Sequence, residues 1–64
     1  MWYEINISKN GHHLFATHER SLGTISQVKE ALNGLRQAFR EEDGFKFTVT
    51  QWETTGKELD INKL

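Results

Sequence analysis

The spacing of apolar residues changes twice along this 64-residue chain, and these changes restrict the fold more than any other feature of the sequence. Apolar and polar side chains alternate over residues 2–8 and again over residues 45–52, whereas residues 24–42 carry apolar side chains at helical spacing. Alternation is typical of a strand with one buried face, and helical spacing is typical of an amphipathic helix. The sequence therefore predicts strands on both sides of a single helix.

A β-hairpin is predicted at the start of the chain. Asn10 and Gly11 follow the first alternating segment, and both residue types tolerate the positive φ angles of a type I′ turn. A second strand then extends from His12 to about His18, and the two-residue loop fixes how the two strands pair. In the predicted register Ser8 faces His13, Ile7 faces Leu14, Asn6 faces Phe15, Ile5 faces Ala16 and Tyr3 faces His18.

The predicted helix over residues 24–42 has a signal at each end. Thr24, with Gln27 three residues later, can form a capping box, and Gly44 lies where a left-handed residue would end the helix. Gly34 costs about 1 kcal/mol relative to Ala in a helix interior. Either a close approach of helix and sheet or a kink would account for this glycine.

The end of the chain is less regular. Residues 45–52 predict a third strand and residues 54–57 a turn, because β-branched and aromatic residues give way to a Thr-Thr-Gly-Lys cluster. Residues 58–62 alternate again, and they predict either a short fourth strand or a frayed tail.

These elements predict an α+β two-layer sandwich with the order β-β-α-β. A right-handed crossover through the helix can skip the first strand, which gives an antiparallel sheet of order 2-1-3 with the helix packed on one face. The expected core combines residues from both layers. It contains Tyr3, Ile5, Ile7, Leu14, Phe45, Phe47 and Val49 from the strands and Val28, Leu32, Leu35 and Phe39 from the helix.

Composition narrows the function classes. Eight basic and nine acidic side chains give a net charge of −1, which argues against nucleic-acid binding by bulk charge. The absence of Cys excludes disulfides, thiolate chemistry and zinc knuckles. The chain has room for one domain, residues 1–64, and it shows neither a leader pattern nor a membrane span, so a cytoplasmic location is expected.

The sheet face away from the helix is the first candidate for function. By the predicted register it carries three large aromatic side chains, and contiguous apolar patches commonly mark interfaces. Three alternatives are open: a partner covers this face, the C-terminal tail covers it with Leu59 and Ile61 over Trp52, or the predicted register is in error. The predicted partner-binding residues are Trp2, Phe15, Lys46, Thr48, Thr50 and Trp52.

The strand from His12 to His18 is the second candidate, because it is expected at the sheet edge without Pro or Lys. Natural edges are usually protected by such residues or by a bulge. This edge therefore either accepts a strand from a second copy or another protein, or is shielded by a bulge or by residues 19–23.

A third candidate is the acidic run Glu41, Glu42 and Asp43 at the predicted helix C-terminus, where negative charge opposes the helix dipole. An acidic surface that mimics phosphate charge toward a basic partner is one interpretation, and an ordinary solvated face is the other.

No catalytic residue, cofactor or metal site is expected. His12 and His13 point to opposite faces of a strand and His18 lies about 20 Å further along, so the three cannot share a metal ion. No serine lies in a nucleophile elbow, and the chain has no Gly-rich phosphate loop. Three carboxylates can approach one another near one end of the sheet: Glu4, Glu53 and Glu58. A catalytic site built across a dimer interface is the one enzymatic option that stays open.

The sequence therefore favours a small non-enzymatic protein-interaction module, homodimeric, that binds a protein partner through the aromatic face or the edge strand. Weak binding of single-stranded nucleic acid by the same aromatics is the alternative, although only Lys46 adds positive charge there. Neither a membrane nor a small-molecule substrate is expected as a partner. In size and plan the chain is similar to small accessory or inhibitor proteins of bacteria and phages, and no family motif accompanies that likeness.

Overall fold

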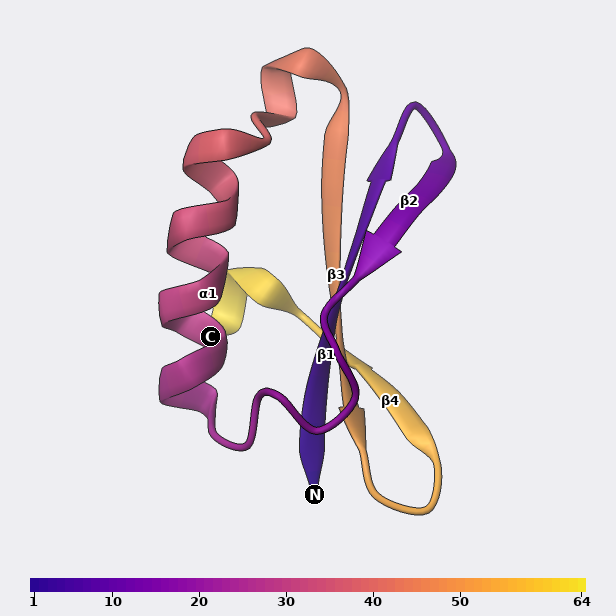
Figure 1. The fold of residues 1–64 in the computed structure, drawn as a ribbon, viewed down its shortest axis with the longest axis vertical. Helices are drawn as coiled ribbons and strands as arrows, with labels where there is room; N and C mark the ends of the chain where they lie inside the picture. Colours follow the sequence, from indigo (N-terminus) through magenta and orange to yellow (C-terminus); the bar gives the residue numbers. More distant parts are fainter.

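The computed structural model describes residues 1–64 and shows a four-stranded antiparallel sheet with one α-helix on one face (Figure 1). The sheet order is β2-β1-β3-β4, so the predicted α+β two-layer fold is confirmed, and the fourth strand is present. The elements are β1 (Trp2–Lys9), β2 (His12–Ala16), α1 (Ile25–Ala38), β3 (Phe45–Trp52), β4 (Gly56–Leu59) and two short 3-10 turns, η1 (Glu41–Asp43) and η2 (Ile61–Lys63).

The β1–β2 hairpin turns where predicted, but its register differs. Asn10 and Gly11 have φ values of 51° and 85°, as a type I′ turn requires, and Ser8 pairs with His13. Beyond that pair the register shifts, so that Ile7 lies opposite Phe15. One extra residue in β2 forms a bulge, and every later side chain of β2 changes face.

The bulge moves Phe15 to the helix side of the sheet and excludes Leu14 from the core. Leu14 is 48% exposed and Phe15 is 41% exposed. The Phe15 ring packs edge-on against Phe39, with the ring centroids 5.4 Å apart. The predicted placements of Leu14 in the core and of Phe15 on the opposite face are therefore wrong, because the bulge brings the larger ring against the end of the helix.

The core lies between the helix and the three strands β1, β3 and β4, much as predicted apart from Leu14. Side chains of β1 and β3 that face α1 alternate with exposed or half-buried ones along both strands. Half-buried residues, Leu35, Phe39 and Phe45 among them, surround the fully buried set. The buried residues are Tyr3, Ile5, Ile7, Val28, Leu32, Phe47 and Val49.

The helix begins as predicted and ends earlier. Thr24 caps α1, because its Oγ1 accepts from the Gln27 backbone N–H at 3.1 Å and the Gln27 side chain accepts from the Thr24 N–H at 3.2 Å. At the other end Phe39 is extended, with φ −122° and ψ 94°, so the helix does not continue to residue 42. Gly44 is left-handed (φ 93°) as predicted, but it closes the η1 turn instead of α1.

The connection from β2 to α1 covers the outer edge of the first half of β1. The Thr17 N–H donates to Ile5 O at 3.0 Å, and the Ile5 N–H donates to Thr17 Oγ1 at 3.0 Å. Further along, the Tyr3 N–H donates to Leu22 O at 2.8 Å. Only β2 itself, five residues long, is left as an edge on this side of the sheet.

The C-terminal tail folds toward the helix. Asp60 caps η2 by accepting from the Asn62 N–H at 2.9 Å, and the chain then turns back beside α1 (Figure 1). Ile61 and Leu64 pack against the core cluster and line a groove together with Leu32 of α1. The tail therefore lies in the helix layer and not over Trp52. No helix in this fold is long and apolar enough to cross a membrane.

Candidate protein-binding face

The open face, the sheet surface that points away from α1, carries the strongest candidate site. Residues paired across antiparallel strands share a face, so the register arranges these side chains in rows across the sheet. The first row is Trp2, Trp52 and Gly56, the second Glu4, Thr50 and Glu58, the third Ala16, Asn6 and Thr48, and the fourth His13, Ser8 and Lys46.

The first row is a stack of two tryptophans. The rings of Trp2 and Trp52 lie 5.9 Å apart between centroids and are inclined by only 19°. Both residues are half-buried, because each ring covers part of the other and Trp52 also lies over Gly56. The indole Nε1 of Trp52 is buried and has no hydrogen-bond partner. The aromatic patch is thus a packed platform at one end of the open face.

Charge is separated along the open face. Glu4 and Glu58 lie on the strands to either side of Thr50, in the row next to the tryptophans. Lys46 lies opposite Ser8, near the hairpin end of the sheet. One end of the face is therefore acidic, and the other carries its single lysine.

A hydrogen-bonded chain links three polar side chains of the open face. Asn6 Nδ2 donates to Glu4 Oε1 at 3.0 Å, and Asn6 Oδ1 lies 3.2 Å from His13 Nε2. These bonds orient Glu4 and His13 toward Asn6 in the middle of the face. The arrangement holds polar groups in place without forming a pocket.

The structure brings together five of the six residues predicted to bind a partner. Trp2, Lys46, Thr48, Thr50 and Trp52 share the open face, whereas Phe15 lies on the helix side. Seven further residues share this face. The alternation of β1 and β2 places five of them there, and the last two depend on β4: Glu4, Asn6, Ser8, His13, Ala16, Gly56 and Glu58.

A second aromatic group, missed from the sequence, lies near the hairpin end on the helix side. The Phe39 ring packs edge-on against both Phe15 and Phe45, at 5.4 and 5.2 Å. The Lys9 ammonium lies 5.0 Å from the centroid of Phe45. With Leu14 exposed beside it, this group closes the end of the core where β2, α1 and β3 meet.

Both sheet edges are short. β2 has five residues and contains the bulge, and β4 has four residues and carries Lys57. Bulges and edge lysines are the usual means by which sheets discourage strand addition. Of the two interpretations offered for the β2 edge, the shielded one agrees with this geometry.

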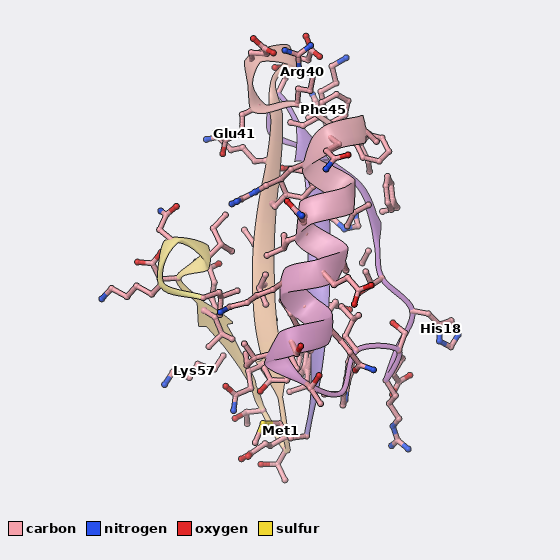
Figure 2. The ribbon with its side chains drawn as sticks, turned by 90° about the vertical axis from the view of Figure 1, so that its left-hand side faces the viewer. Met1, His18, Arg40, Glu41, Phe45 and Lys57 are labelled. Atoms are coloured by element: carbon pink, nitrogen blue, oxygen red, sulfur yellow. The ribbon has the colours of Figure 1, made fainter.

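The acidic run is exposed and does not belong to α1. Glu41, Glu42 and Asp43 form η1, and Glu42 makes an ion pair with Arg40 in which both side chains are 62% exposed. Figure 2 looks onto α1 and shows Arg40, Glu41 and Phe45 gathered at one end of the molecule. The predicted conflict with the α1 dipole does not arise, because the helix ends at Ala38.

A groove of about 610 Å³ lies between α1 and the connection before it, where Ser21 and Gln27 are among the lining residues. Ser21 Oγ donates to His18 O at 2.6 Å, and Gln27 belongs to the capping box, so both have structural partners. No three His, Asp or Glu side chains are placed to hold a metal ion.

Comparison with known proteins adds no relative: no family model, curated protein or solved structure matches this chain.

Proposed function

We propose that this protein is a non-enzymatic, cytoplasmic protein-binding module that docks its partner on the open face. One observation carries the proposal: α1 and the C-terminal tail both pack on the same side of the sheet. Nothing within the chain covers the other side, where a tryptophan platform adjoins polar and charged side chains. A mixture of aromatic and polar groups of this kind is the usual composition of a non-obligate protein interface.

The face is favoured over the edges as the docking surface. An added strand needs a regular row of unpaired backbone groups, and the bulge at Leu14 interrupts that row in β2. The β4 edge offers only four residues before the chain turns away. The open face, in contrast, extends over the full lengths of β1 and β3.

Charge favours protein over single-stranded nucleic acid as the ligand. Nucleic-acid binding by stacking requires a basic groove beside the aromatic rings. Here the row next to the tryptophans contains Glu4 and Glu58, and Lys46 lies at the far end. Two carboxylates beside the stacking platform would repel a phosphate backbone.

The proposal is tested with a variant at the centre of the open face. Thr48 is exposed, so Thr48→Arg adds bulk and charge there without disturbing the core. The matched control is Gln37→Arg on the exposed surface of α1. Each protein is immobilised and exposed to host extract, and any captured protein is then purified and its Kd measured against all three.

The expected result is a partner that binds the wild type and Gln37→Arg equally and Thr48→Arg at least about tenfold more weakly. Circular dichroism should show that both variants are folded. If no protein, including a second copy of this chain, distinguishes Thr48→Arg from the control, the proposal is wrong. Saturable quenching of tryptophan fluorescence by a single-stranded oligonucleotide would favour the nucleic-acid alternative.

A further inference from the structure

We infer that the partner of the open face is a second copy of this chain, packed face to face with its strands running in the opposite direction. The inference rests on the proposed function and adds the identity and orientation of the partner. It follows from the separation of charge along the face, where Glu4 and Glu58 lie toward one end and Lys46 toward the other. Such a surface is complementary to itself when one copy is reversed.

The register fixes which residues meet in the reversed pair. A two-fold axis through the row of Thr48, lying across the strands between the two sheets, places β3 of one copy over β3 of the other. Lys46 then lies over Thr50 of the second copy. The carboxylates of Glu4 and Glu58 flank that position on the neighbouring strands, about 5 Å to either side. By symmetry the same contact forms twice.

The parallel arrangement of two faces is disfavoured by the same charges. A two-fold axis along the strands would place Lys46 opposite Lys46 of the second copy. It would also place the row of Glu4 and Glu58 opposite the same row of the second copy. Like charges opposed across an interface cost several kcal/mol and select against a wrong partner. Of the two arrangements, only the reversed pair brings unlike charges together. In it the Trp2–Trp52 platform of each copy lies beyond the Lys46 row of the other copy, at the two ends of the interface.

The size of the face sets the expected strength of the pair. Three rows overlap in the reversed pair, those of Lys46, Thr48 and Thr50, and they cover about 20 Å along the strands. Each row crosses three strands, about 14 Å, which gives about 280 Å² in projection per copy. A standard interface buries about 800 Å² per partner. The contact is therefore a weak, reversible dimer, and because its selectivity is electrostatic it weakens as the salt concentration rises.

The test reverses the charges of the open face and measures self-association. Sedimentation velocity is carried out at low salt and at protein concentrations up to the millimolar range. The wild type should shift from one copy toward two as concentration rises. Lys46→Glu places like charges together and should raise the dimer Kd about tenfold or more, as should the double variant Glu4→Lys/Glu58→Lys. The matched control Lys57→Glu, on the helix side of β4, should dimerise like the wild type.

Mixing the two charge variants decides the orientation. In the reversed pair the glutamate introduced at position 46 of one copy meets the lysines introduced at positions 4 and 58 of the other. The mixture should therefore associate although each variant alone does not. A mixture that stays monomeric, or variants that each dimerise like the wild type, would overturn the inference. So would a wild type that remains monomeric, or one that grows beyond two copies.

Failure here is separable from failure of the proposed function. Suppose that the wild type is monomeric and that a captured protein binds it in a way that depends on Thr48. That result contradicts the dimer but supports the protein-binding function. If neither self-association nor capture depends on the open face, both fail. Circular dichroism of each charge variant confirms that the substituted side chains, which lie outside the core, leave the fold intact.

Discussion

The indole of Trp52 lies directly over Gly56 on the neighbouring strand, so close that a Cβ on residue 56 would be 2.8 Å from Cη2 of the ring. The same Cβ would lie 3.0 Å from Thr50 Cγ2. Gly56 is therefore the position where β4 leaves room for the tryptophan platform. The stack with Trp2 depends on an absent side chain as much as on the two rings.

Gly56→Ala should displace Trp52 and lower the free energy of unfolding by about 1–2 kcal/mol, because an added methyl group has no space beneath the ring. The loss should appear in urea denaturation, and the near-ultraviolet circular dichroism of the stacked tryptophans should decrease. Unchanged stability together with an unchanged tryptophan spectrum would show that the ring does not rest on β4.

Gly34→Ala should have the opposite effect and raise the free energy of unfolding by about 0.5–1 kcal/mol. Apart from its chain neighbours and the backbone of α1, no atom lies within 4 Å of a Cβ at this position, so the alanine gains helix propensity without a clash. A close approach of helix and sheet is therefore not the reason for this glycine. Destabilisation on the same urea curve would mean that the groove beside α1 closes over residue 34.

Thr24→Ala should lower the free energy of unfolding by about 1 kcal/mol, because the capping box loses the acceptor for the Gln27 N–H. Thr24→Ser is the matched control, since it keeps the hydroxyl and should retain most of the stability. Thermal denaturation followed by far-ultraviolet circular dichroism measures both. Equal losses in the two variants would place the effect outside the cap.

Phe15→Ala should cost more stability than Leu14→Ala, which tests the bulge in β2. Phe15 packs against Phe39, and an aromatic pair contributes about 0.5–1.5 kcal/mol beyond its burial. Leu14 is 48% exposed and should lose less than about 1 kcal/mol. The unbulged register predicts the reverse order, so denaturant midpoints of the two variants distinguish the registers.

Local signals gave the type and order of β1, β2, α1 and β3 correctly. The Asn10-Gly11 turn, the capping box at Thr24 and the alternation of β1 and β3 depend on residues close together in the chain, and all are present. The antiparallel sheet with a helix on one face followed from the same signals. β4 could not be separated from a frayed tail, because four residues carry too little pattern to identify a strand.

The candidate face was predicted in most of its residues, and its error has one cause. Strict alternation assigned Phe15 to the open face, because a bulge cannot be seen in a five-residue strand of mixed polarity. The contact that accompanies the bulge is made by Phe39, far along the chain. The η2 turn likewise packs beside α1 through Ile61 and Leu64, a choice that the tail sequence alone does not contain.

The spacing of apolar residues and local backbone preferences were enough to predict the two layers, the order of the elements and the start of the helix. These features depend on residues that are close together in the chain. Three-dimensional packing settled the rest: the face on which Phe15 lies, the end of α1 at Ala38 and the side of the sheet taken by the tail. Each of these outcomes is a competition between contacts made by residues distant in the chain. Their combined result is a sheet whose second face is left open to a partner.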